Sequence, residues 1–123
     1  MRVTRPSPSS VISRRYRPPA IPTISNVTGD FYSADAQEAR ALLVAHIRSP
    51  VLFVRGLQNL HDASARLFIE VGPKKALQGF AEDVLGHDPS VVTIFTNHPK
   101  FGDIPSFNAA LCACWAAGVG CGA

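Results

Sequence analysis

Residues 67–73 read Leu-Phe-Ile-Glu-Val-Gly-Pro, an apolar run of strand length that ends abruptly at a glycine–proline pair. An apolar run this short and continuous is typical of a strand in a parallel sheet whose two faces are both covered. Gly-Pro is a strong breaker of regular structure. The stretch therefore predicts a buried strand over residues 67–71 followed by a sharp turn at Gly72 and Pro73.

The residues that follow this turn predict the rest of an α/β unit. An apolar stripe with a four-residue repeat predicts an amphipathic helix over residues 76–85, which Gly86 ends. Residues 91–95 form a second apolar, β-branched run, and residues 107–115 carry the apolar spacing of a last helix. A strand–helix–strand–helix order predicts a parallel sheet. The apolar helix faces call for a wider sheet than these strands supply.

The residues before this unit predict one edge strand and two helices. Residues 21–27 are β-prone, and Pro22 places them at a sheet edge because proline donates no ladder hydrogen bond. Residues 34–47 have helical periodicity. A second helix is expected to open at Pro50, which fits the first position of a helix, and to end near Asp62.

Composition and charge restrict the class of protein. At 123 residues, 46% hydrophobic and 17% charged, the chain has the size and composition of one small globular domain. No apolar run reaches the ~20 residues of a membrane span, so no membrane is expected. Five arginines and no acid lie in residues 1–19, which predicts a disordered basic leader. Because the rest of the chain is slightly acidic, no nucleic-acid partner is expected.

The chain carries no familiar catalytic or metal-binding motif. Gly-x-Ser-x-Gly, which mounts a nucleophilic serine at a strand–helix turn, does not occur. Residues 72–79 lack the Gly-Lys-Ser/Thr ending of a phosphate-binding loop. The three cysteines and four histidines do not have the paired spacing of a zinc site. The residues alone therefore predict an α/β protein and no metal site.

Three segments together resemble the acyltransferase domains of type I polyketide synthases. Residues 19–29, Pro-Ala-Ile-Pro-Thr-Ile-Ser-Asn-Val-Thr-Gly, are similar to the family's P-x-I-P-x-x-S-N-x-T-G stretch. Residues 46–53, His-Ile-Arg-Ser-Pro-Val-Leu-Phe, resemble its H-x-R-x-P-V-x-F element, and residues 68–73 resemble its F-x-E-V-G-P turn. The three follow one another in the family's order and spacing, over about residues 18–120.

The resemblance implies a fold and a division of the chain. The fold class is α/β: the C-terminal portion of the α/β-hydrolase-like large subdomain, with one residual strand from the ferredoxin-like small subdomain. Residues 1–19 are the disordered leader, residues 20–120 the partial acyltransferase domain, and residues 121–123 the start of a linker.

The resemblance also implies a reaction. A serine takes a malonyl-type group from a coenzyme A thioester and passes it to the phosphopantetheine thiol of an acyl carrier protein. A histidine activates that serine, and an arginine holds the malonyl carboxylate. The serine and the arginine match positions upstream of the small subdomain. The histidine is expected about twenty residues before the P-x-I-P stretch, and the corresponding residues 1–17 contain no histidine. His46 matches the residue whose main-chain carbonyl accepts the Nδ1–H of the catalytic histidine, so its expected role is carried by backbone and not by its imidazole.

The expected partners are an acyl carrier protein and neighbouring synthase domains, in the cytoplasm. CoA thioester is the expected substrate of the intact family, and no bound cofactor is expected. The leading hypothesis is an acyltransferase fragment that is inactive alone. Two alternatives stay open: a non-catalytic interaction module that kept this scaffold, and a truncated or frame-shifted gene product.

Overall fold

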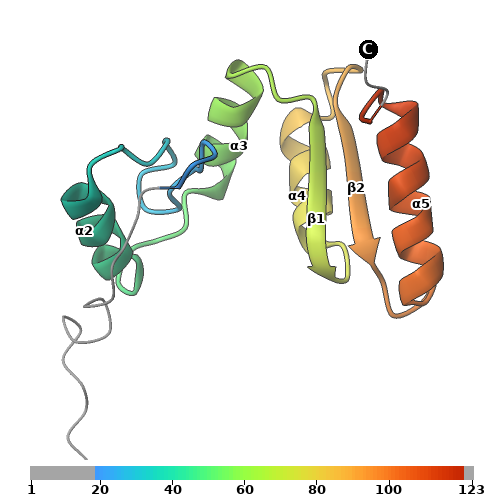
Figure 1. Cartoon of the computed structure of the whole chain (residues 1–123), viewed down its shortest axis with the longest axis horizontal. Helices are drawn as coiled ribbons and strands as arrows, with labels where there is room; N and C mark the ends of the chain where they lie inside the picture. The colour runs from blue at the N-terminus through green and yellow to red at the C-terminus, as the bar shows by residue number, and fades with distance from the viewer. Residues whose placement is uncertain (1–18, 121–123) are drawn as a thin grey trace, which may run out of the picture. The chain divides into compact units, whose positions relative to one another are not determined.

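A computed structural model describes residues 19–120. Its elements in chain order are α2 (Ala36–His46), α3 (Phe53–Asp62), β1 (Leu67–Pro73), α4 (Ala76–Leu85), β2 (Val92–Asn97) and α5 (Asp103–Ala116) (Figure 1). They fall into two compact units, the first ending at Gly56 and the second beginning at Leu57. The predicted leader, except Pro19, and the predicted linker start lie outside the described residues.

The expected edge strand over residues 21–27 is the main departure from the sequence prediction. This segment forms a single antiparallel bridge, between Ile24 and Phe31, and no longer strand. The chain turns back at once, since the Ser25 amide donates to the Asp30 carbonyl at 2.8 Å and the Gly29 amide to the Ser25 carbonyl at 2.7 Å. Among the described residues no further strand lies beside it, so the predicted residual strand of the small subdomain has nothing to pair with.

The two helices of the first part occur where periodicity predicts them, with one shifted start. Asp35 caps α2, because its carboxylate accepts the amide hydrogens of Gln37 at 2.6 Å and Glu38 at 3.0 Å. The next helix begins at Phe53 and not at Pro50. Leu52 takes the N-cap position: its amide donates to the Asn26 carbonyl at 2.8 Å, and its carbonyl accepts the Gly56 amide at 3.0 Å.

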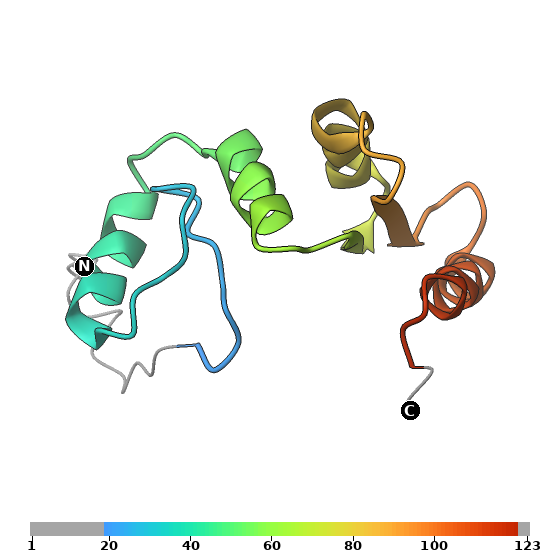
Figure 2. The ribbon, with the colours of Figure 1, turned by 90° about the horizontal axis from the view of Figure 1, so that it is seen from above.

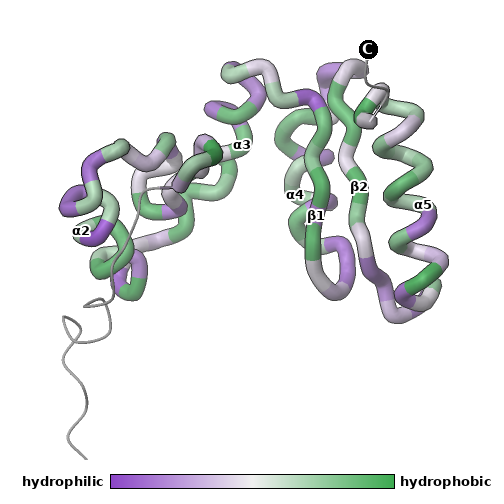
Figure 3. Tube along the Cα trace, in the orientation of Figure 1, coloured by the Kyte–Doolittle hydropathy of each residue, from purple (hydrophilic) through white to green (hydrophobic). Residues whose placement is uncertain are grey.

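The second unit is the predicted α/β arrangement. Strands β1 and β2 are parallel, with Leu67 opposite Val92 and Glu70 opposite Phe95. Helix α4 contacts both strands, α5 contacts β2, and Figure 2 shows the two helices on opposite sides of the sheet. Figure 3 shows hydrophobic residues along most of both strands, as in a sheet that has helices on its faces. The structure thus confirms the predicted α/β class and parallel pairing.

The core of this unit is small for its apolar content. Its buried apolar side chains are Leu57, Ala81, Leu85 and Ala110. Large apolar residues of α4 and α5 remain exposed; they are Leu77, Phe80, Ile104, Phe107, Leu111 and Trp115. The two strands therefore leave apolar helix surface uncovered, as the sequence pattern predicts.

An ionic cluster ties the end of α3 to the loop between α4 and β2. The Asp88 carboxylate accepts the Ser90 hydroxyl at 2.6 Å and lies 2.8 Å from Nε2 of His61. The Nε atom of Arg66 lies 3.8 Å from the same carboxylate. The Ser90 hydroxyl contributes most, followed by His61, in holding the pKa of Asp88 well below its usual range.

This cluster predicts a specific loss of stability in acid. Because folding lowers the pKa of Asp88 from its usual value of 3.8, its ionised form stabilises the fold above that pH and the benefit disappears as the pH falls. We expect Asp88→Asn to lower the urea midpoint at pH 7 and to flatten its decline between about pH 5 and pH 2. Asp83→Asn removes the same charge at an exposed position of α4 and is the control. Equal acid sensitivity in wild type and Asp88→Asn would contradict the assignment.

Candidate functional site

His46, the predicted supporting residue, is the last residue of α2. Its carbonyl accepts one long hydrogen bond, from the Ser49 amide at 3.4 Å. The residue four positions on, which would normally bond this carbonyl in a continuing helix, is Pro50, and proline has no N–H to donate. The carbonyl therefore keeps acceptor capacity for a donor from another segment.

The first two sequence motifs meet in the structure. The turn of the first motif, residues 25–29, accepts the Leu52 amide of the second motif through the Asn26 carbonyl. Ser25 is fully buried in this turn, and its Oγ accepts the Val27 amide at 3.2 Å. Gly29 has φ 68°, and a Cβ there would lie 2.8 Å from the Arg55 side chain. Glycine at this position thus allows both the turn and the close approach of α3.

A cavity of about 500 Å³ lies at this meeting point. Its charged lining residues are Asp30, Glu38 and Arg55, from the turn, α2 and α3 respectively. The remaining lining residues are Val27, Thr28, Phe31, Ser33, Leu42 and Leu52. Sequence periodicity gave no indication of this cavity, because its lining comes from elements whose side chains only the tertiary fold brings together.

The third motif ends β1 and holds the start of α4. Lys75, at the N-cap position, makes no capping hydrogen bond with its side chain. Instead, Oε2 of Glu70 accepts the amide of Gln78, in the first turn of α4, at 2.8 Å. A carboxylate there complements the positive end of the helix dipole and offsets the nearby Lys74 and Lys75 charges. No capping-box pattern indicates this contact, since Glu70 lies eight residues before Gln78.

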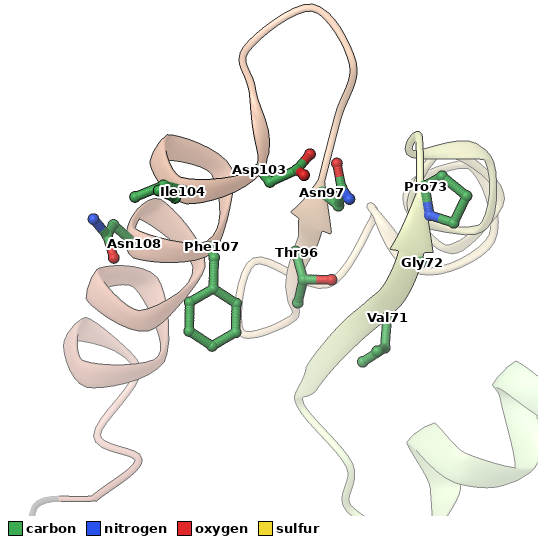
Figure 4. Close-up of a pocket in the computed structure, with 9 residues that line it drawn as sticks. All are labelled: Val71, Gly72, Pro73, Thr96, Asn97, Asp103, Ile104, Phe107 and Asn108. Atoms are coloured by element: carbon green, nitrogen blue, oxygen red, sulfur yellow. The ribbon is translucent and has the colours of Figure 1, made fainter.

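A second cavity, of about 570 Å³, opens beside the carboxyl ends of the two strands (Figure 4). Val71 and Thr96 line it from β1 and β2, and Ile104 and Phe107 line it from α5. Its other lining residues are Gly72, Pro73, Asn97, Asp103 and Asn108. Ligands in open parallel sheets bind at this end of the strands, but the lining here is dominated by apolar groups and contains no histidine, cysteine or serine.

Other kinds of site have little support within residues 19–120. No group of three or more His, Cys, Asp or Glu residues there is placed to hold a metal ion. None of the helices described is long and apolar enough to cross a bilayer. The site geometry therefore consists of two cavities and the His46 carbonyl, which accepts one long hydrogen bond and can accept a second, without a nucleophile–base pair among the described residues.

Comparison with known proteins assigns this geometry to a class. No protein-family model matches the sequence. A polyunsaturated fatty acid synthase from Thraustochytrium sp. is 40% identical over 106 residues, covering 82% of this chain and 4% of that protein. The acyltransferase domain from the second module of the salinomycin polyketide synthase superposes with a TM-score of 0.81 and 28% identity, covering 91% of this chain and 26% of that domain.

A third match is the malonyl CoA-acyl carrier protein transacylase from Clostridium perfringens, with a TM-score of 0.61, 26% identity and 77% of this chain covered. The α/β fold and these matches define a partial acyltransferase fold. More particularly, the chain belongs to the acyltransferase domains of polyketide synthases, as the three motifs predict. It spans about a quarter of the solved domains, in agreement with the predicted C-terminal placement.

Proposed function

We propose that this chain is the part of a polyketide-synthase acyltransferase domain whose backbone holds the catalytic histidine in its active orientation. The whole domain would move a malonyl-type group from a coenzyme A thioester to the phosphopantetheine thiol of an acyl carrier protein. The superposition of 91% of the chain on a polyketide-synthase acyltransferase domain carries this proposal. For the same reason, we expect its partners to be neighbouring synthase domains and an acyl carrier protein.

The proposed role of His46 follows from its backbone. An imidazole takes a proton from a serine hydroxyl through one ring nitrogen only when the other nitrogen holds its N–H in a fixed direction. The His46 carbonyl, with one long bond from Ser49 and no bond from Pro50, is suited to accept such an N–H. In this role His46 is a positioning residue, and its own side chain takes no proton.

The remaining parts of the proposed reaction come from other segments. The chain contains no Gly-x-Ser-x-Gly, so the nucleophile, its base and the arginine for the malonyl carboxylate would be supplied in the same domain by residues beyond this chain. Alone, the chain is proposed to be inactive. The expectations of a cytoplasmic location and of no bound cofactor stay predictions.

The test joins this chain to an upstream acyltransferase segment that carries the serine elbow and the base. The fused domain is expected to transfer malonyl from CoA to a carrier protein. His46→Ala is expected to keep most of kcat, because the main chain persists. Pro50→Gly is expected to lower kcat more, since it supplies an N–H that can bond the His46 carbonyl and loosens the turn that aims it.

Two outcomes would contradict this function. A His46→Ala loss of about 10²–10⁴-fold, with a smaller effect of Pro50→Gly, would make the imidazole a general base and the backbone role wrong. A folded fusion that binds malonyl-CoA without transferring the acyl group would overturn the acyltransferase assignment itself. Far-ultraviolet circular dichroism of every variant provides the folding control.

A further inference from the structure

The chain tightens where it leaves α2. In a continuing α-helix the amide of Ser49 would donate to the carbonyl four residues back, which is that of Ala45. Here the Ser49 amide donates to the His46 carbonyl at 3.4 Å, and the Arg48 amide donates to the Ala45 carbonyl at 3.0 Å. Each of these bonds joins residues three apart, so the helix ends in a turn of 3₁₀ type.

The side chain of Ser49 occupies the acceptor that its own amide leaves. Its hydroxyl donates to the Ala45 carbonyl at 2.9 Å, in a partly buried position. A serine hydroxyl that bonds the carbonyl four residues back competes with the backbone and bends the helix. A carbonyl oxygen has two lone pairs, and the hydroxyl and the Arg48 amide fill those of Ala45. The Ser49 amide is thereby directed to His46.

Pro50 accounts for only part of this arrangement. It removes the N–H that would bond the His46 carbonyl, and it biases Ser49 toward an extended backbone. The choice between an α-helical and a 3₁₀ turn lies in residues 46–48, which this restriction does not reach. Within residues 19–120, the Ser49 hydroxyl supplies the side-chain hydrogen bond that holds the turn.

We propose that the Ser49 hydroxyl positions the His46 carbonyl for the catalytic histidine. By occupying the Ala45 carbonyl it keeps the turn after α2 tight, and the tight turn sets the direction of the His46 carbonyl. Ser49 is thus a positioning residue that acts through the backbone and touches no reacting atom. The inference rests on the proposed function of His46. It adds a side chain to that role, at a position that the H-x-R-x-P-V-x-F motif leaves unspecified.

The decisive comparison is Ser49→Val against Ser49→Thr in the fused domain. Both side chains are β-branched and suit the extended backbone that Pro50 favours, but only threonine keeps the hydroxyl. In Ser49→Val the Ala45 carbonyl is free for an ordinary helical bond, which turns the His46 carbonyl away. We expect kcat to fall about 10-fold, because a misdirected base transfers its proton poorly. The KM for malonyl-CoA is expected to stay the same, and Ser49→Thr is expected to restore most of kcat.

The pH profile of kcat/KM gives a readout that a loss of folded protein would not move. A carbonyl that accepts the N–H of a histidine favours the charged imidazolium and raises the pKa of that histidine. Misdirecting the carbonyl lowers this pKa, so the acidic limb of the profile is expected to move to lower pH in Ser49→Val and to stay in place in Ser49→Thr.

Thr23→Val is the matched control in the same unit. It removes another hydroxyl-to-carbonyl bond of 2.9 Å, from Thr23 to Ile21, at an exposed position. We expect it to change neither kcat nor the pH profile. An equal loss of kcat in Thr23→Val and Ser49→Val would show a general sensitivity of the unit and would overturn the inference.

The isolated 123-residue chain tests the turn without catalysis. By NMR, the carbonyl-carbon chemical shifts of Ala45 and His46 are expected to move in Ser49→Val and to stay near their original values in Ser49→Thr. Equal shifts in both variants, or a kcat that threonine does not restore, would overturn the inference.

The two proposals can fail separately. If the unmutated fusion transfers malonyl and Ser49→Val transfers it equally fast, the positioning role of Ser49 is wrong and the proposed function stands. If the turn responds as expected but the unmutated fusion, folded by circular dichroism, transfers nothing, the proposed function is wrong, and Ser49 shapes the turn without a catalytic consequence.

Discussion

Incubated with malonyl-CoA, the 123-residue chain is expected to show no acyl adduct by intact-mass analysis. An acyl-enzyme requires a hydroxyl or thiol within reach of a base that takes its proton. Three of the described serine hydroxyls donate elsewhere: Ser49 to the Ala45 carbonyl at 2.9 Å, Ser106 to the Gly102 carbonyl at 2.7 Å, and Ser90 to Asp88. None of these bonds joins a serine to a histidine.

The acylation rate of the isolated chain is expected to be as low as that of an enzyme from which the nucleophile or its base has been removed. In serine hydrolases, removal of the nucleophile or its base lowers kcat by about 10⁶-fold. The chain incubated with malonyl-CoA is therefore expected to show no more acyl adduct than the chain incubated with coenzyme A that carries no malonyl group. The fused domain described above serves as the positive control. A stoichiometric adduct on any serine of the isolated chain would show that it contains a complete nucleophilic site, and the assignment as a supporting part would be wrong.

Leu85→Ala is expected to unfold the second unit or to leave it barely stable. Leu85 is 2% exposed and closes α4 against the two strands, in a core with few other large buried side chains. Replacing a buried leucine by alanine costs about 2–5 kcal/mol, from lost burial and the cavity left behind. Small domains are stable by only about 5–15 kcal/mol. Among the described residues, the sheet of this unit consists of β1 and β2 alone.

Leu77→Ala is the matched control, because it makes the same chemical change on the same helix. Leu77 is 47% exposed, so its loss is expected to change the free energy of unfolding by about 0.5 kcal/mol. Urea unfolding followed by circular dichroism measures both variants. Equal effects at the two positions would mean that Leu85 is not at the centre of the core.

Several features of the fold could be predicted from the sequence because they depend on local chemistry. The apolar runs at residues 67–71 and 91–95 and the four-residue repeat between them predicted β1, α4 and β2 and their parallel pairing. Such patterns survive folding because each element needs one buried face, whatever covers it. The three family motifs likewise predicted the acyltransferase assignment, through their resemblance to that family in sequence, order and spacing.

Other features were decided by contacts between residues distant in the chain. The segment over residues 21–27 has strand propensity, yet it makes one bridge, because a strand exists only where another strand pairs with it. Pro50 fits a helix start, yet α3 begins at Phe53, with Leu52 at the N-cap position and its amide bonded to the distant Asn26 carbonyl. Propensity is worth only tenths of a kcal/mol per residue, so tertiary contacts of about 1 kcal/mol can shift where an element begins.

The candidate site divides in the same way. The family resemblance singled out His46, and the sequence places Pro50 four residues after it. The structure shows that α2 ends at His46 and not at Ile47 as the periodicity predicted, so the His46 carbonyl lacks the next helical donor. Three other features depend on contacts that no local pattern indicates: Glu70 caps α4, His61 bonds Asp88, and Ile69 and Val71 are exposed. These features escape prediction because their partners lie far apart along the chain. Periodicity indicates which residues share a face of a helix or strand, whereas hydrogen-bond partners and burial depend on which other elements pack against that face.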